Sequence, residues 1–129
     1  DGLADVELKA LVEEHRKFGK LATVTSVRPP GRYGVLSLDD CSTVTRFVEK
    51  PEGEMGWING GFFVLEKQCL GLIEGAETSW EDGPLRYLVE AGQLHAYRHN
   101  GFWKAMDTLR DKRQLDDMWN SGDCPWKVW

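Results

Sequence analysis

The chain has 129 residues, of which 41% are hydrophobic and 29% charged, and its formal net charge is −5. This length suits one domain spanning residues 1–129, whose core buries roughly 65–70% of the unfolded surface. The negative charge argues against a general nucleic-acid-binding protein, which needs a positive field over the phosphates. No apolar run approaches the ~18 residues of a membrane span, so we expect a soluble protein without a membrane partner.

The cysteines indicate the redox compartment of the protein, and the first residues indicate whether the chain starts at a natural terminus. Cys41, Cys69 and Cys124 are odd in number and form no CxxC spacing, so neither a disulfide framework nor a zinc site is indicated. This favours a reducing cytoplasm. Residue 1 is Asp, and no charged and then apolar leader follows it, so we expect the chain to be cut from something longer.

The first half of the sequence predicts a helix, a strand and a hairpin. An apolar stripe at helical spacing predicts a helix over residues 6–18, with Asp5 as its N-cap and Gly19 beyond its end. The β-branched residues of 21–27 predict a strand. Two further strands, at residues 33–38 and 44–49, flank the turn-forming sequence DDCS and predict a hairpin.

The second half predicts five further elements. They are a strand at residues 58–65, a short helix at 66–74, a helix from Pro84 to Gly92, a strand at 93–98 and a helix ending near Asn120. Asp107 or Thr108 is expected to cap the last helix, and Thr108 and Asp111 have the spacing of a capping box. Proline is tolerated at the first position of a helix, which favours Pro84 as a start.

This order of elements predicts an α/β fold with a mixed, mainly parallel sheet and flanking helices. The order opens on a helix. We therefore expect the strand that precedes this helix to lie before residue 1.

Glu49-Lys50-Pro51 ends one of the predicted strands. Pro51 withholds a backbone donor and keeps Lys50 extended, so strand pairing should stop there. Side chains alternate along a strand, so Glu49 and Lys50 can serve one ligand only if the strand bends or ends between them. A charged strand end in water and a phosphate contact by Lys50 both remain open.

Asn59-Gly60-Gly61 interrupts an otherwise apolar strand. Glycines inside a strand cost conformational entropy and indicate either a bulge or the close approach of a ligand or another backbone. The Asn59 amide can both donate to and accept from a hydroxylated ligand. Upstream, the segment PPGRYG places Arg32 and Gly34 at the start of a predicted strand. It is either a surface turn or a site where the missing side chain of Gly34 lets a sugar ring approach the backbone.

Asp107 lies where a short apolar stretch passes into the last helix. It is either a helix cap or a ligand of Mg²⁺, a hard cation that proteins hold by one or two carboxylates plus substrate phosphates. Asp1 is the natural partner for such an ion. The histidines show no metal-ligand spacing and His15 suits a core or boundary position. The tryptophans that crowd the carboxyl end suit core or subunit contacts; they are Trp119, Trp126 and Trp129.

Five segments, RPPGRYGVL, FVEKPEG, WINGGFFVLE, GFWKAMDTLRDK and PWKVW, together resemble the glucose-1-phosphate cytidylyltransferases, a branch of the sugar nucleotidyltransferase family. The resemblance spans essentially the whole chain. It implies a Rossmann-like nucleotidyltransferase fold, a homo-oligomer, and transfer of a cytidylyl group from CTP to α-D-glucose 1-phosphate. The products would be CDP-glucose and pyrophosphate, used in deoxysugar and surface polysaccharide or lipopolysaccharide synthesis.

The resemblance also implies roles for individual residues. Asp1 and Asp107 would hold Mg²⁺ and, with Lys50, form the catalytic set. Lys50 would contact the sugar phosphate, and Glu49 the sugar hydroxyls. The remaining residues implied for the sugar pocket are Gly34, Asn59, Gly60 and Trp103.

The chain departs from the family in one respect. Family members carry a Gly-rich nucleotide-binding loop ahead of the position of Asp1, and none is present here, so we expect this amino-terminal part to be lacking and the chain alone not to catalyse. Two alternatives stay open. One is a related transferase for another base or sugar, and the other is a non-catalytic sugar-phosphate-binding or assembly module.

Overall fold

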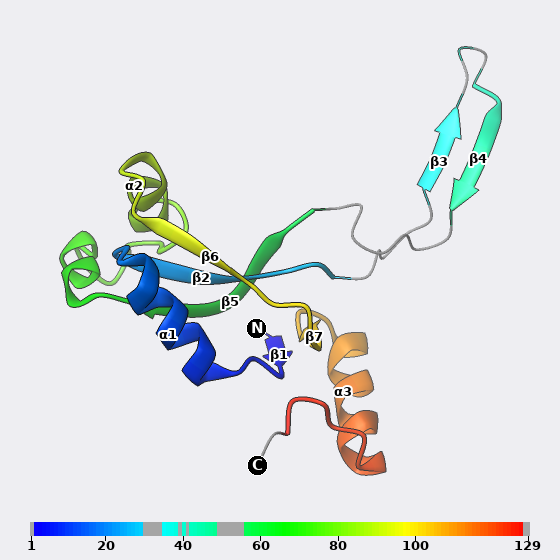
Figure 1. Ribbon diagram of the computed structural model, residues 1–129. Coiled ribbons are helices and arrows are strands. Elements are labelled where there is room, and N and C mark those ends of the chain that lie inside the picture. The colour runs from blue at the N-terminus through cyan, green and yellow to red at the C-terminus, as the bar shows by residue number, and fades with distance from the viewer. Residues whose placement is uncertain (1, 30–34, 39, 41, 49–55, 128–129) are drawn as a thin grey trace.

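The computed structural model of the protein describes residues 2–29, 35–38, 40, 42–48 and 56–127, and the statements below concern these residues. Figure 1 shows the elements in chain order: β1 (Gly2–Ala4), α1 (Leu8–Phe18), β2 (Ala22–Val27), β3 (Val35–Leu38), β4 (Val44–Val48), β5 (Ile58–Leu65), the 3₁₀ helix η1 (Lys67–Leu72), α2 (Pro84–Glu90), β6 (Leu94–Arg98), β7 (Trp103–Ala105) and α3 (Leu109–Ser121).

The central sheet has three strands in the order β5-β2-β6, and the whole of β2 is buried. The expected mixed sheet with flanking helices is confirmed. The expectation of a mainly parallel sheet is corrected, because β2 and β6 are the parallel pair whereas the other described pairs, β2–β5, β1–β7 and β3–β4, are antiparallel. β5 returns the chain to the start of β2, where Leu65 lies opposite Ala22, and the segment that holds η1 and α2 then leads to β6, whose Leu94 also lies beside Ala22, so β6 runs parallel to β2.

Helices cover both faces of this sheet. α1 lies against the face that carries Thr23, because His15 Nδ1 lies 2.8 Å from Thr23 Oγ1. The residues on either side of Thr23 along β2 point to the opposite face. There Ala22 forms an apolar cluster with Cys69 of η1 and Leu88 of α2. Figure 1 accordingly shows α1 and α2 on either side of the sheet.

The start of α1 differs from the prediction. Glu7, not Asp5, caps the helix, and its carboxylate accepts from the backbone N–H groups of Lys9 and Ala10. Asp5 is held elsewhere, since its backbone N–H donates to the Phe102 carbonyl at 3.2 Å. The end agrees with the prediction, because Gly19 is in the left-handed conformation at φ 59°.

The other helices follow the sequence closely, apart from residues 66–74. That segment forms only the short 3₁₀ helix η1, with Gly71 inside it, as is common for short connecting turns. α2 begins at Pro84 as predicted. Among the described residues, no helix is both long and apolar enough to cross a membrane.

Two short strands were not predicted. β1 precedes α1 and pairs with β7, with Gly2 opposite Ala105 and Ala4 opposite Trp103. The expectation that the chain opens on a helix is therefore corrected. Three residues are too few to show an alternating pattern, and glycine and alanine are poor strand formers.

The predicted hairpin of β3 and β4 is confirmed by their antiparallel pairing, in which Val35 lies opposite Val48. It stands apart from the central sheet in Figure 1. Phe47 on β4 is 59% exposed.

Candidate active site

β5 contains a bulge at its centre. On one side of it Phe63 pairs with Val24, and on the other side Asn59 pairs with Ser26. The three residues 60–62 therefore lie opposite Thr25 alone, where a regular antiparallel pair would have one residue. Bulges of this kind redirect a strand and commonly border active sites.

The two glycines of the bulge are required for different reasons. A Cβ on Gly60 would lie 2.9 Å from the carbonyl oxygen of Thr25 and 2.9 Å from Val27 Cγ1, which is too close. Gly61 adopts φ 87°, a conformation that side-chain-bearing residues rarely adopt. Both explanations suggested by the sequence thus hold, and the backbone that approaches Gly60 is that of β2.

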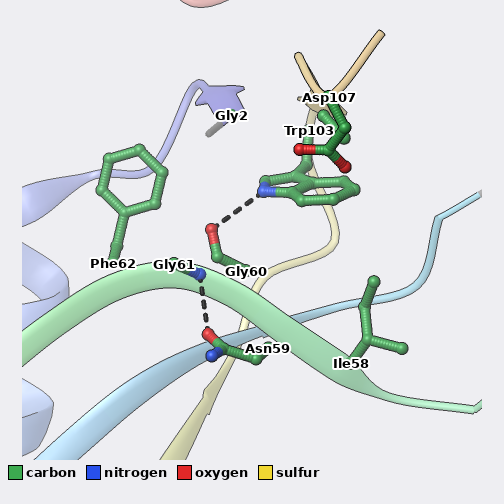
Figure 2. Close-up of a pocket in the computed structure, with 9 residues that line it drawn as sticks. Gly2, Ile58, Asn59, Gly60, Gly61, Phe62, Trp103 and Asp107 are labelled. Carbon is green, nitrogen blue, oxygen red and sulfur yellow. Dashed lines mark hydrogen bonds between the residues drawn. The ribbon is translucent and has the colours of Figure 1, made fainter. Parts of the chain in front are cut away.

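The Asn59 side chain secures the bulge. Its Oδ1 accepts the backbone N–H of Gly61 at 2.8 Å, the local bond by which asparagine stabilises a turn. Figure 2 shows the side chain turned back along β5 toward Gly61. The Asn59 NH₂ group has no partner among the described residues, and Asn59 is exposed, so this amide can still donate to a ligand.

Trp103 of β7 contacts the bulge from the other side. Its indole Nε1–H donates to the Gly60 carbonyl at 2.9 Å (Figure 2). Gly2 of β1 makes room for the ring, because a Cβ at Gly2 would lie 3.3 Å from Trp103 Nε1. The indole is therefore held between β1 and β5 by one hydrogen bond and close contacts.

Asp107 follows β7 and does not cap α3. Thr108 is the N-cap: its hydroxyl accepts from the backbone N–H of Asp111 at 3.1 Å, and the Asp111 carboxylate accepts from the backbone N–H of Thr108 at 3.1 Å. This capping box confirms the predicted spacing and resolves the choice between Asp107 and Thr108. Asp107 instead lines a cavity together with Trp103.

That cavity has a volume of about 580 Å³, within the ~300–1,000 Å³ range of small-molecule sites. It brings together every predicted site residue that the structure describes, namely Asn59, Gly60, Trp103 and Asp107. It is also lined by residues to which the sequence analysis assigned no role in the sugar pocket: Gly2, Ile58, Gly61, Phe62 and Ala105. Figure 2 shows most of this lining.

Sequence signals for the missed lining residues were weak. Two of them had a signal: Gly2 directly follows Asp1, a predicted metal ligand, and Gly61 belongs to the glycine pair that interrupts the predicted strand. Ile58, Phe62 and Ala105 are ordinary apolar strand residues, whose side-chain types do not distinguish a cavity wall from a core. The other predicted site residues lie outside the described residues: Asp1, Gly34, Glu49 and Lys50.

A second set of contacts fixes the turn between β6 and β7 against the end of β1. Asp5 Oδ1 lies 2.9 Å from His99 Nε2, while the same nitrogen lies 3.1 Å from the Phe102 carbonyl. Asp5 Oδ1 makes no well-directed hydrogen bond, so its approach to His99 is a close contact between a carboxylate and an imidazole. Gly101 completes the set, because a Cβ there would clash with Asp5 Oδ1 and His99 Cε1. This arrangement sets where β7, and hence Trp103, begins.

The other histidines serve the fold. His15 is buried as predicted and bridges Thr23 and Glu66. His95 contacts Glu14 at 2.8 Å and stacks on Phe18 with ring centroids 3.9 Å apart. Among the residues that the structure describes, no group of three or more His, Cys, Asp or Glu side chains could hold a metal ion.

The tryptophans near the carboxyl end divide between core and surface. Trp126 is buried against Phe102, with ring centroids 5.5 Å apart. Trp119 is 53% exposed, and the Lys127 amine lies 5.2 Å from its ring centroid. Trp129 lies outside the described residues.

Residues 1–114 match the family described as Nucleotidyl transferase. The chain belongs to this family. The region matched contains β1, the β5 bulge, β7 and Asp107, and so every described residue of the cavity.

Similar nucleotidyltransferases fall in the predicted branch and in a related one. The whole chain is 47% identical to half of the glucose-1-phosphate cytidylyltransferase of Salmonella typhi. It is 36% identical to a mannose-1-phosphate guanyltransferase of Aspergillus oryzae, over 96% of this chain and 34% of that protein. The resemblance to the cytidylyltransferases is thus confirmed, and the chain spans about half the length of those relatives.

Solved structures agree on the fold. A Bacillus anthracis protein described as a glucose-1-phosphate thymidylyltransferase superposes with a TM-score of 0.60 at 16% identity, over 92% of this chain and 51% of that one. HddC from Yersinia pseudotuberculosis gives a TM-score of 0.58 at 19% identity, over 92% and 52%. The Rossmann-like nucleotidyltransferase fold expected from the sequence is confirmed.

Proposed function

We propose that the full-length protein containing this chain is a glucose-1-phosphate cytidylyltransferase and that the cavity binds the acceptor sugar phosphate. The observation that supports this most directly is the meeting of Asn59, Gly60, Trp103 and Asp107 around one cavity. These residues come from β5, β7 and the segment before α3, and all were assigned to the site from the family resemblance of the sequence. The chain is 47% identical to a relative named for this activity.

In this proposal the sugar lies against the β5 bulge. Gly60, which has no side chain, and the indole of Trp103 form one wall of the cavity, and the Asn59 NH₂ group donates to a sugar hydroxyl. Gly34 belongs to the same pocket, and Glu49 accepts from other hydroxyls. Lys50 makes a charge-assisted contact to the sugar phosphate.

The carboxylates suit Mg²⁺, which proteins commonly bind through one or two carboxylates, with waters and substrate phosphates completing the coordination. Asp107 lines the cavity, and Asp1 is the residue directly before Gly2, which lines the same cavity. These two would hold the ion. When bound, Mg²⁺ neutralises phosphate charge and orients the reacting groups.

The reaction forms one P–O bond and breaks another. A phosphate oxygen of glucose 1-phosphate attacks the α-phosphorus of CTP, and the bond to the β-phosphate breaks, so that pyrophosphate leaves with the bonding electrons. The attacking phosphate is already ionised near neutral pH, so the chain need not supply a general base. Its residues act by positioning two anions and offsetting their repulsion, as in other transfers at phosphorus.

The site is tested by assaying CDP-glucose formation in the full-length protein, with Lys50→Ala and Asp107→Ala beside it. We expect each variant to lose activity by about a hundredfold or more, as when a charged group at a transferring phosphate is removed. Asp117→Ala, an exposed carboxylate on α3, is the matched control and should retain full activity. Unchanged rates in both site variants would refute the assignment.

The alternatives are separated by two further measurements. A panel of CTP, UTP, dTTP and GTP identifies the base, which the cavity does not contact in this proposal. Calorimetry with glucose 1-phosphate, with and without Mg²⁺, tests the non-catalytic module, for which the absence of binding would be the signature. The 129 residues alone are expected to bind the sugar phosphate weakly and to form no CDP-glucose, since they correspond to half of the relatives' length.

Assembly and location are part of the same proposal. We expect a homo-oligomer in a reducing cytoplasm, for which light scattering of the full-length protein gives the stoichiometry.

A further inference from the structure

Two arginines converge on one tryptophan at the end of the central sheet. The guanidinium carbon of Arg28 lies 4.4 Å from the ring centroid of Trp57, and that of Arg98 lies 5.7 Å from the same centroid. These distances are within the ~6 Å reach of a cation–π contact.

The strand registers bring this group together. Arg98 is the last residue of β6 and pairs with Ser26 of β2, and Arg28 stands two residues after Ser26. Residues two apart on a strand share a face, so the two arginines lie on one face of the sheet. Trp57 directly precedes Ile58, which pairs with Val27, so it reaches Arg28 from β5.

This face is the one opposite α1. Ser26 has the same orientation along β2 as Ala22, whose apolar cluster is covered by η1 and α2. That cluster lies at the start of β2, whereas the arginines lie at its end, where Arg28 and Arg98 are exposed. Ligands of open α/β sheets also collect at the carboxyl ends of parallel strands, which is where β2 and β6 end here.

The charge of the group is not balanced within the described part of the chain. No carboxylate among the described residues pairs with Arg28 or Arg98, whereas the exposed Arg86 pairs with Asp82 at 3.3 Å. The chain as a whole carries a net charge of −5, so two guanidinium groups that contact one indole without a carboxylate partner among the described residues are not a feature of a generally basic surface. Both guanidinium groups contact the same indole, so their like charges repel, and an anion bound by both would offset that repulsion.

We propose that Arg28, Trp57 and Arg98 form a binding site for a phosphate-type oxyanion. Guanidinium groups match phosphate oxygens in planar, two-pronged hydrogen bonds, and the indole keeps both groups in place. Trp57 is the chain neighbour of Ile58, which lines the cavity, but none of the three residues of this site belongs to the cavity lining. The site goes beyond the acceptor pocket and uses none of the residues assigned to the transfer.

The experiment measures the binding of inorganic pyrophosphate to the full-length protein by calorimetry, for the wild type, Arg28→Gln and Arg98→Gln. Arg86→Gln is the matched control, since it removes one exposed arginine from α2, outside the proposed site. Each site variant should weaken binding by about tenfold or more, as expected for one charge-assisted contact, and the control should bind as the wild type does. Titrations with CTP and glucose 1-phosphate show which phosphate compound uses the site.

Tryptophan fluorescence locates the anion. Trp57→Phe keeps an aromatic ring under the guanidinium groups, so it should still bind pyrophosphate while losing the fluorescence change seen in the wild type. The proposal is overturned if the two site variants bind all three compounds like the wild type, or if Arg86→Gln weakens binding equally. CDP-glucose formation is measured on the same samples, so failure of this site remains distinct from failure of the transfer.

Discussion

The indole of Trp103 and the carbonyl of Gly60 are joined by a 2.9 Å hydrogen bond between residues 43 positions apart in the chain. The bond ties the short β7 to the bulged centre of β5 and fixes one wall of the cavity. The positions of Asn59 and Asp107 relative to each other therefore depend on it. The indole N–H of Trp103 thus both stabilises the fold and determines how far apart the cavity walls lie.

Trp103→Phe removes this donor and keeps an aromatic ring. The Gly60 carbonyl loses its partner, so the free energy of unfolding should fall by about 1 kcal/mol. The KM for glucose 1-phosphate should rise several-fold with a smaller change in kcat, because a loosened wall affects binding before chemistry. Trp119→Phe, at an exposed tryptophan of α3, is the control for both measurements. An unchanged KM would show that the indole does not shape the sugar site.

Gly60→Ala tests the close approach of β2. The added methyl would meet the Thr25 carbonyl and Val27 at 2.9 Å, so urea denaturation should show a loss of about 1–3 kcal/mol. Gly71→Ala should change stability by less than about 0.5 kcal/mol, because nothing lies within 4 Å of a Cβ there. Equal effects at the two glycines would mean that the contact with β2 relaxes freely.

Asn59→Asp separates the two tasks of this side chain. The oxygen that accepts from Gly61 is retained, so stability should change by less than about 0.5 kcal/mol, whereas Asn59→Ala should cost about 1 kcal/mol. Affinity for glucose 1-phosphate should fall by about tenfold in Asn59→Asp, because a donor is lost and a negative charge faces an anion. Asn120→Asp makes the same charge change on α3. Should both Asp variants bind alike, Asn59 has no part in the sugar site.

Cys69 should be unreactive near neutral pH. Burial raises the pKa of its thiol, because the thiolate is poorly solvated there, and the S–H group donates to the Leu21 carbonyl at 3.1 Å. A raised pKa in the folded state stabilises the fold below the ordinary thiol pKa, and this stabilisation is lost as pH rises through the raised value. Site-resolved mass spectrometry with iodoacetamide should show slower labelling of Cys69 than of the partly exposed Cys124, until urea is added. Equal rates in the absence of urea would contradict this.

Local signals predicted much of the fold. β5 has the predicted bounds, 58–65, because an apolar run with clear flanks is sufficient to specify a strand. The capping box of Thr108 and Asp111 and the left-handed Gly19 also follow from neighbours in sequence. In each case the interacting groups lie within a few residues of one another.

The parts that could not be predicted depend on distant partners. Asp5 was expected to cap α1, but it is held beside His99. β1 and β7 stabilise each other as a pair, and neither has enough residues to show a pattern alone. The site residues were named from their resemblance to a family, whereas the reason that Gly60 must lack a side chain is supplied by β2, which the sequence around Gly60 does not indicate.

The extra length of β5 at its bulge is an even number of residues. Phe63 consequently pairs with Val24 and Asn59 with Ser26, and these two residues of β2 point to the same face of the sheet. The alternation of β5 side chains between the two faces is therefore the same before and after the bulge. A single extra residue would have exchanged the two faces beyond it. The sheet can therefore accept this irregular stretch, and the cavity it shapes, as an insertion that leaves the pairing on both sides intact.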